Sequence, residues 1–165
     1  MWEKKIVGTK YMLANDSMCD DIKRDHGDSF PLAYQLHALD EHGEFRGLSR
    51  LLGIDPEGIL YIGKSKTVQP RIANLRKSVC AAYRKVGGKI YEKLVYMDFG
   101  AHQTGKKIVT MPRFVEFFPF ERLCLTVEPC WGRKEGKGVV DPADLEAQLQ
   151  QAYMARYGEN PPLND

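Results

Sequence analysis

The stretch Gly58-Ile59-Leu60-Tyr61-Ile62-Gly63-Lys64-Ser65 decides how this chain is interpreted. Its letters fit G-x-x-x-x-G-K-[ST], the pattern of a loop whose backbone N–H groups cradle phosphate. The residues between the two glycines are aliphatic or aromatic, however, and such residues favour strands over turns. We therefore predict a strand from Ile59 to Ile62 that ends at Gly63. A phosphate loop in a nucleotide-binding protein is the alternative.

Strands and helices are predicted on both sides of this stretch. The run from Phe30 to Leu39 alternates between two faces, which is typical of a strand, and the run from Arg122 to Val127 does the same. From Pro70 to Tyr83 apolar residues recur at spacings of three and four, so we predict an amphipathic helix. A last helix is predicted after Asp141, whose side chain suits the N-cap position.

Two further regions complete the predicted organisation. Residues 48–54 contain four aliphatic side chains and predict a short helical turn within an insert at residues 40–57. Residues 1–29 are predicted to be an N-terminal extension to a core of residues 30–165. Together the patterns predict one α+β domain, residues 1–165, resembling an α/β sandwich. Its small, mainly antiparallel central sheet is expected to have three strands flanked by helices.

The composition is that of a folded protein without a membrane span. The chain has 165 residues, of which 43% are hydrophobic and 28% charged. Its longest apolar run is too short to cross a bilayer, and no apolar stretch follows Met1–Lys5 to form a signal peptide. Four scattered cysteines lack the C-x-x-C spacing of a zinc site and are expected to be reduced core thiols. We therefore expect a cytoplasmic protein with no membrane partner.

Charge is unevenly distributed along the chain, although the net charge is only +2. Residues 1–63 carry 7 basic and 11 acidic side chains, whereas residues 64–93 carry 9 basic side chains and one acidic side chain, Glu92. The nine are Lys64, Lys66, Arg71, Arg76, Lys77, Arg84, Lys85, Lys89 and Lys93. Such a segment is typical of a surface that binds a polyanion, and a solvated basic helix face is the alternative.

Five sequence elements, taken in order, resemble the GIY-YIG nuclease domain over residues 30–165. In that family a first strand carries a Tyr, a second carries Tyr-Ile-Gly, a helix with an Arg follows, a later helix holds one metal-binding Glu, and an Asn follows near Pro. The matching residues here are Tyr34, Tyr61-Ile62-Gly63 with Lys64 after it, Arg71, Glu146, and Asn164 after Pro161-Pro162-Leu163. The resemblance implies a metal-dependent DNA endonuclease that hydrolyses phosphodiester bonds.

The chain also departs from the family pattern. The Gly and Ile of the first element are absent, and the connection from Gln35 to Leu60 is longer than in compact members. One turn after Arg71, where many members have a Tyr or His, this chain has Leu75. The candidate that replaces the missing polar group is His102. The longer connection resembles the restriction-endonuclease branches, and phage, mobile-element and repair roles are also compatible.

The resemblance implies a role for each site residue. Tyr34 is the implied general base, although a phenol with a pKa of about 10 is a poor base unless cations such as Lys64 and Arg71 lie nearby. Tyr61 is expected to orient the water or the phosphate, and Arg71 to neutralise the charge that develops on it. Glu146 is expected to hold Mg²⁺ or Mn²⁺, since Mg²⁺ takes few protein ligands.

Duplex DNA is the expected partner. The nucleic-acid-binding candidates are Lys66, Arg76, Lys77, Arg84, Lys106 and Lys107. Asn164 is predicted either to fix the C-terminal tail or to hydrogen-bond within the site. We expect Tyr34 and Tyr61 on adjacent antiparallel strands, with Arg71 and Glu146 on the same face. The oligomeric state is left open, with a homodimer as one option. A nucleic-acid-binding module that keeps this fold without the activity is the other alternative.

Overall fold

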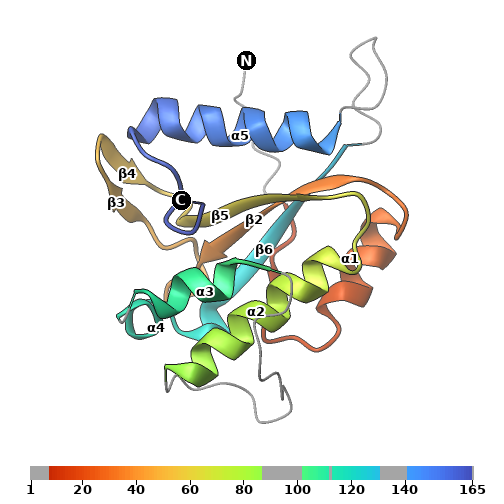
Figure 1. Ribbon diagram of the computed structural model, residues 1–165, viewed down its shortest axis with the longest axis horizontal. Coiled ribbons are helices and arrows are strands. Elements are labelled where there is room, and N and C mark those ends of the chain that lie inside the picture. Colours follow the sequence, from red (N-terminus) through yellow and green to blue (C-terminus); the bar gives the residue numbers. More distant parts are fainter. Residues whose placement is uncertain (1–7, 87–101, 112, 131–140, 165) are drawn as a thin grey trace.

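A four-stranded antiparallel sheet forms the centre of the protein, and helices cover both of its faces (Figure 1). The predicted α+β class is confirmed, but the sheet has four strands and not three. The computed structural model describes residues 8–86, 102–111, 113–130 and 141–164. Within these residues no helix is both long and apolar enough to cross a membrane.

The strands of the main sheet lie in the order β1-β6-β2-β5, so β5 is an edge strand. The elements in chain order are β1 (Tyr11–Met12), α1 (Met18–His26), β2 (Leu32–Ala38), β3 (Leu48–Arg50), β4 (Gly53–Asp55), β5 (Ile59–Ser65), α2 (Arg71–Lys85), α3 (Thr104–Val109), α4 (Phe114–Phe117), the 3₁₀ helix η1 (Phe120–Arg122), β6 (Leu123–Pro129) and α5 (Pro142–Tyr157). The residues around β1 are compatible with a short strand or a helix by sequence, because a strand of two residues is too short to show a period of two.

The stretch around Gly63 is a strand, as predicted. β5 pairs with β2 in antiparallel register, with Gly63 opposite Tyr34 and Tyr61 opposite Leu36. The two tyrosines therefore lie on adjacent antiparallel strands, which confirms that expectation. The backbone of residues 59–65 takes part in the ladder and does not form a loop around phosphate, so the nucleotide-binding alternative is wrong.

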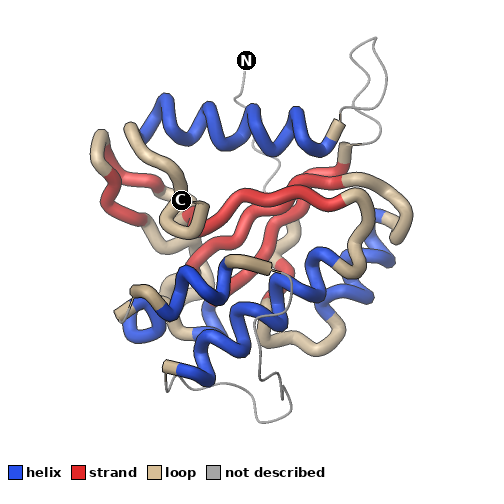
Figure 2. Tube along the Cα trace, viewed as in Figure 1, coloured by secondary structure: helices blue, strands red, loops and turns tan. Residues whose placement is uncertain are grey.

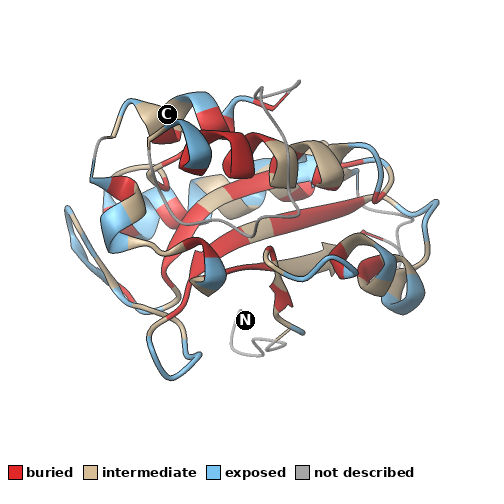
Figure 3. Cartoon of the chain, turned by 90° about the horizontal axis from the view of Figure 1, so that it is seen from below, coloured by how far each residue is buried: buried red, intermediate tan, exposed pale blue. Residues whose placement is uncertain are grey.

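The two faces of the sheet are covered by different helices (Figure 2). Alternate residues of β2, such as Leu32 and Tyr34, join the large core shared with α1, α2 and α3. On the other face, Ala33 packs with Leu145 of α5. Figure 3 shows that the sheet strands are largely buried, whereas the helices present exposed residues on their outer sides. Because β5 is an edge strand, residues of the two helical layers can approach each other around it.

Residues 48–54 lie in the β3–β4 hairpin and not in the helical turn that their apolar residues predict. Leu51 and Leu52 at its tip are 72% and 66% exposed, so they do not form the core-facing stripe that stabilises a helix. The buried carboxylate of Asp55 instead accepts a hydrogen bond from the backbone N–H of Ile59 at 2.8 Å. This contact ties the hairpin to the start of β5.

Candidate active site

Two tyrosine rings lie directly over Gly63. The ring centroids of Tyr34 and Tyr61 are 6.1 Å apart, with 37° between their planes. A Cβ atom on Gly63 would lie 2.6 Å from Cζ of Tyr34 and 2.6 Å from Cε1 of Tyr61. Only glycine allows both rings to approach the backbone here, which gives the Tyr-Ile-Gly triplet a steric explanation.

Arg71 brings a cation to both phenols. It is the first residue of α2, and its guanidinium interacts with the hydroxyl groups of Tyr34 and Tyr61. Burial raises the pKa of Tyr34, and neighbouring Tyr61 adds to the rise, whereas the charge of Arg71 opposes it. Burial also raises the pKa of Tyr61, and Arg71 again opposes the change. Arg71 is therefore placed to stabilise a phenolate or another anion at this position.

The two tyrosines differ in their access to solvent. Tyr34 has no exposed surface, whereas Tyr61 is partly exposed. A general base must touch the group whose proton it takes, directly or through one water. In this conformation Tyr34 cannot do so, and Tyr61 can. Of the two phenols, Tyr61 is therefore the one that solvent reaches, and Tyr34, which the resemblance implies as the general base, lies behind it.

His102 enters the site from the loop before α3. Its Nε2 lies 3.1 Å from Oη of Tyr34, although the two residues are 68 positions apart, and its ring makes an edge contact with Tyr61 at 5.4 Å. Burial, and secondarily the charge of Arg71, lowers the pKa of His102 to about 4. His102 therefore lies against both tyrosines, while Leu75 lies in the core.

Glu146 approaches from the other side of the sheet. Its Oε2 lies 3.1 Å from Nζ of Lys64, and both residues lie toward α5. Lys64 sits opposite Ala33, which belongs to the α5 face. The expectation that Glu146 shares a face with Tyr61 is therefore wrong, because α5 packs on the opposite layer from α2. The two groups still approach each other around the edge strand, where the charge of Glu146 is a lesser contributor, after burial, to the raised pKa of Tyr61.

Asn164 holds the C-terminal tail against the edge of β5. Its Oδ1 accepts the backbone N–H of Ile62 at 2.8 Å, and its Nδ2 donates to the carbonyl of the same residue at 2.8 Å. Leu163 adds a backbone hydrogen bond to Leu60 at 2.9 Å. Of the two roles predicted for Asn164, the structure supports fixing the tail. Because both polar groups of its amide bond the backbone, a catalytic role is not supported.

A cleft of about 820 Å³ opens at the end of β5. It is lined by Pro31, Lys64, Ser65, Lys66, Arg71, Asp141, Pro142 and Ala143. The long helices α2 and α5 both begin at this cleft, with Arg71 and Pro142 as their first residues. Helix N-termini carry partial positive charge, and three cationic side chains line the same walls, so the cleft favours an anion.

The basic candidates fall into two groups. Lys66, Arg84 and Lys106 are exposed, and Lys77 and Lys107 are partly exposed. Arg76, in contrast, donates to the carbonyl of Leu13 at 2.7 Å and pairs with Asp16 at 3.2 Å. Its side chain is only 12% exposed, so Arg76 presents much less of its charge to solvent than the other candidates do. Lys89 and Lys93 of the basic segment lie outside the described residues.

Two further polar residues of this region, Thr104 and Ser78, contact His102. The hydroxyl of Thr104 lies 2.7 Å from Nδ1 of His102, and the hydroxyl of Ser78 donates to the carbonyl of His102 at 2.8 Å. Neither residue belongs to a spacing motif, so only the fold reveals them. Across the part of the chain that the structure describes, no three His, Cys, Asp or Glu side chains gather to hold a metal ion.

Comparisons with protein-family models, with curated proteins and with solved structures gave no match to this chain.

Proposed function

We propose that this protein is a metal-dependent DNA endonuclease of the GIY-YIG type, with its active site at the edge of β5. The observation that carries the proposal is that Arg71 and Lys64 line one cleft, while Arg71 also contacts the phenol of Tyr61 and Lys64 pairs with Glu146. Hydrolysis of a phosphodiester needs an oriented water and positive charge at the phosphoryl oxygens, and these residue types supply both.

Each side chain has a role that follows from its place. Tyr61 is the partly exposed phenol, so it orients or deprotonates the attacking water. Arg71 contacts both phenols and faces the cleft, so it stabilises the phenolate and the charge that develops on the phosphate. Lys64 and Lys66 line the same cleft and attract the DNA backbone. Gly63 has no side chain, which leaves room for both tyrosine rings against the backbone.

Glu146 is the residue that would hold a divalent metal. It supplies a single carboxylate, which suits Mg²⁺ or Mn²⁺ because these ions keep several waters and use substrate oxygens as ligands. A bound metal would supply Lewis-acid stabilisation of the phosphate. Lys64 Nζ lies 3.1 Å from the Glu146 carboxylate, so this ion pair must loosen when a cation binds there.

The alternative is a nucleic-acid-binding module without catalytic activity. The full burial of Tyr34 and the Lys64–Glu146 ion pair are the observations that favour it. Both proposals expect binding to duplex DNA, so binding alone does not separate them.

Cleavage of supercoiled plasmid and of a defined duplex, with Mg²⁺ or Mn²⁺ and with a chelator, tests the proposal. Glu146→Gln keeps the side-chain size and should reduce cleavage by about 100-fold or more while DNA binding persists. Asp144→Asn removes one charge from the same helix at an exposed position and should cleave like the wild type. Absent cleavage would contradict the endonuclease assignment, and intact binding would then favour the inactive module. Cleavage that Glu146→Gln leaves unchanged would contradict the assignment of Glu146 as the metal-binding residue.

A further inference from the structure

The two long helices that begin at the cleft carry opposite charge, and the following inference rests on the proposed function. Residues 59–86, which contain β5 and α2, and residues 102–111, which contain α3, together have nine Lys or Arg side chains and no Asp or Glu. Residues 141–164, which contain α5, have four acidic side chains and one basic side chain. A polyanion that leaves the cleft is therefore attracted toward α2 and repelled by α5.

α3 lies beside α2 and extends the same basic surface (Figure 1). The hydroxyl of Ser78, in the middle of α2, donates to the carbonyl of His102 at 2.8 Å and accepts from the backbone N–H of Gly105 at 2.9 Å. These hydrogen bonds hold the start of α3 against α2. Lys106 on α3 is exposed, so the two helices present their cations on one continuous surface.

The cations of α2 extend far from the cleft. Arg71 lines the cleft as the first residue of the helix, and Arg84 is exposed in its last turn. At a rise of 1.5 Å per residue, the two positions are about 20 Å apart along the helix axis. Lys77 lies between them, seven residues before Arg84 and so on the same face of the helix. Because duplex DNA advances 3.4 Å per base pair, this length corresponds to about six base pairs.

α5 offers no comparable path. Asp141, its N-cap residue, lines the cleft, and Asp144 is exposed in its first turn. The exposed side chains from there to Arg156 in the last turn are all uncharged: Ala147, Gln148, Gln151, Ala152, Met154 and Ala155. DNA that crossed α5 would meet carboxylates first and then no cation until the far end of the helix.

We propose that duplex DNA bound at the cleft extends along α2 and α3 only, so that the protein holds about six base pairs on one side of the scissile phosphate. The DNA on the other side, toward α5, is left in solvent. Lys and Arg contact the phosphates of the held side, and such contacts carry no sequence information. The protein therefore requires duplex on one side of each cut, whatever its sequence.

The two helices supply a matched pair of variants, Arg84→Gln and Arg156→Gln. Each removes one exposed charge from the last turn of a long helix that begins at the cleft, so the changes in net charge and at the helix C-terminus are the same. Circular dichroism establishes that both variants fold like the wild type. Any difference in DNA binding between them then reports the position of the charge.

Binding to a random-sequence duplex, measured with a chelator over a salt series, tests the surface without cleavage. Arg84→Gln should bind about threefold more weakly or worse, and its slope of log affinity against log salt should be smaller by about one. Arg156→Gln should keep the affinity and the slope of the wild type.

The positions of the cuts report the direction of the DNA. Short random-sequence duplexes are cleaved with Mg²⁺ and the product ends are sequenced. Cuts should be depleted within about six base pairs of one end of each strand, always the end of the same polarity, and should occur close to the other end. Arg84→Gln should narrow the depleted zone, and Arg156→Gln should leave it unchanged.

Binding and cleavage together separate this inference from the proposed function. A protein that shows the expected difference in binding but does not cut DNA would contradict the nuclease assignment and keep the DNA path along α2. Equal binding by the two arginine variants would overturn that path even in an active enzyme. Cuts that are depleted equally at both ends of a strand, or at neither end, would overturn it as well.

Discussion

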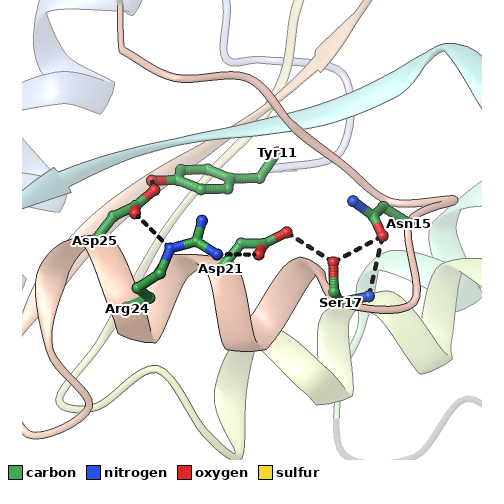
Figure 4. A network of polar contacts seen from close by, with 6 residues as sticks. All are labelled: Tyr11, Asn15, Ser17, Asp21, Arg24 and Asp25. Carbon is green, nitrogen blue, oxygen red and sulfur yellow. Dashed lines mark hydrogen bonds and ion pairs between the residues drawn. The ribbon is translucent and has the colours of Figure 1, made fainter.

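Two tyrosines of this protein, the buried Tyr11 and the partly exposed Tyr61, lie beside charged partners of opposite sign. Tyr11 of β1 donates its hydroxyl proton to Oδ2 of Asp25 at 2.8 Å, and Arg24 pairs with both Asp25 and Asp21 (Figure 4). Burial, followed by the hydrogen bond to Asp25, raises the pKa of Tyr11 to about 12. Tyr61, in contrast, has Arg71 as its main charged neighbour, and that charge opposes the effect of burial.

The contrast shows what makes a phenol chemically useful. Burial by itself raises the pKa of both tyrosines, because a phenolate is poorly solvated inside a protein. A carboxylate partner makes the phenol a permanent donor and ties down a helix, as Tyr11 does for α1. A guanidinium and a second hydroxyl instead favour the phenolate. The sign of the partner, together with access to solvent, therefore distinguishes the candidate base from the structural tyrosine.

The largest expected effect is the difference in cleavage rate between variants that lack the hydroxyl of Tyr61 or of Tyr11. Tyr61→Phe should lower the cleavage rate by about 100-fold or more, because general-base catalysis contributes on this scale. Tyr11→Phe removes the same atom from a tyrosine that lies outside the cleft and should cleave at the wild-type rate. Single-turnover cleavage of one duplex by both variants makes the measurement. Equal rates for the two variants would mean that Tyr61 is structural as well.

Sequence patterns predict the parts of the site that are local. Tyr61, Gly63 and Arg71 lie within one strand and the first residue of the following helix, and Tyr34 lies on a strand with clear alternation. Such elements follow from a period of two or 3.6 and from short connections. His102 could be proposed only through the family resemblance, because a single loop histidine carries no pattern of its own.

The failures of the sequence patterns all concern contacts between distant segments. The apolar stripe of α5 fits either face of the sheet, so the sequence could not say from which side Glu146 approaches. Arg76 looks solvated on a helical projection, yet the loop after β1 covers it and supplies the carbonyl of Leu13. Leu51 and Leu52 suggest a core, although they sit exposed on a hairpin tip. These outcomes depend on topology, which local periodicity does not encode.

A second prediction compares how the two regions respond to acid. Folding lowers the pKa of His102 to about 4. As the pH falls below about 6.5, the imidazole therefore gains a proton in the unfolded chain but stays neutral in the folded protein. Stability should therefore fall by about 1.4 kcal/mol for each pH unit from 6.5 down to 4 on account of His102. Burial also lowers the pKa of His37, which adds to this loss of stability as the pH falls. Chemical denaturation across this range measures the slope.

His102→Gln should reduce that slope without abolishing it, because the contribution of His37 remains. His42→Gln, which changes an exposed histidine on a surface turn, should leave the slope of the wild type. If His102→Gln keeps the full slope, His102 is not the neutral buried imidazole that the hydrogen bonds to Thr104 and Tyr34 require.

The smallest expected effect belongs to the Tyr11 region, and it falls in a different pH range. The hydrogen bond from Tyr11 lowers the pKa of Asp25, with Arg24 as a further cause. A carboxylate whose folded pKa is depressed stabilises the protein above its unfolded pKa of about 3.9, and this stabilisation is lost as pH falls through the lower folded value. Tyr11→Phe should therefore flatten the decline of the thermal midpoint below about pH 4 and leave the limb between pH 6.5 and 4 unchanged.

The double variant decides whether the hydrogen bond is the cause. Asp25→Asn should flatten the same acid limb as Tyr11→Phe, and combining the two should add little, since both remove one interaction. Additive effects would show that Asp25 is stabilised mainly by Arg24, which also contacts it. The hydrogen bond from Tyr11 to Asp25 would then contribute little to the lowered pKa of Asp25. The difference between Tyr11 and Tyr61 would then rest on the charge of Arg71 beside Tyr61.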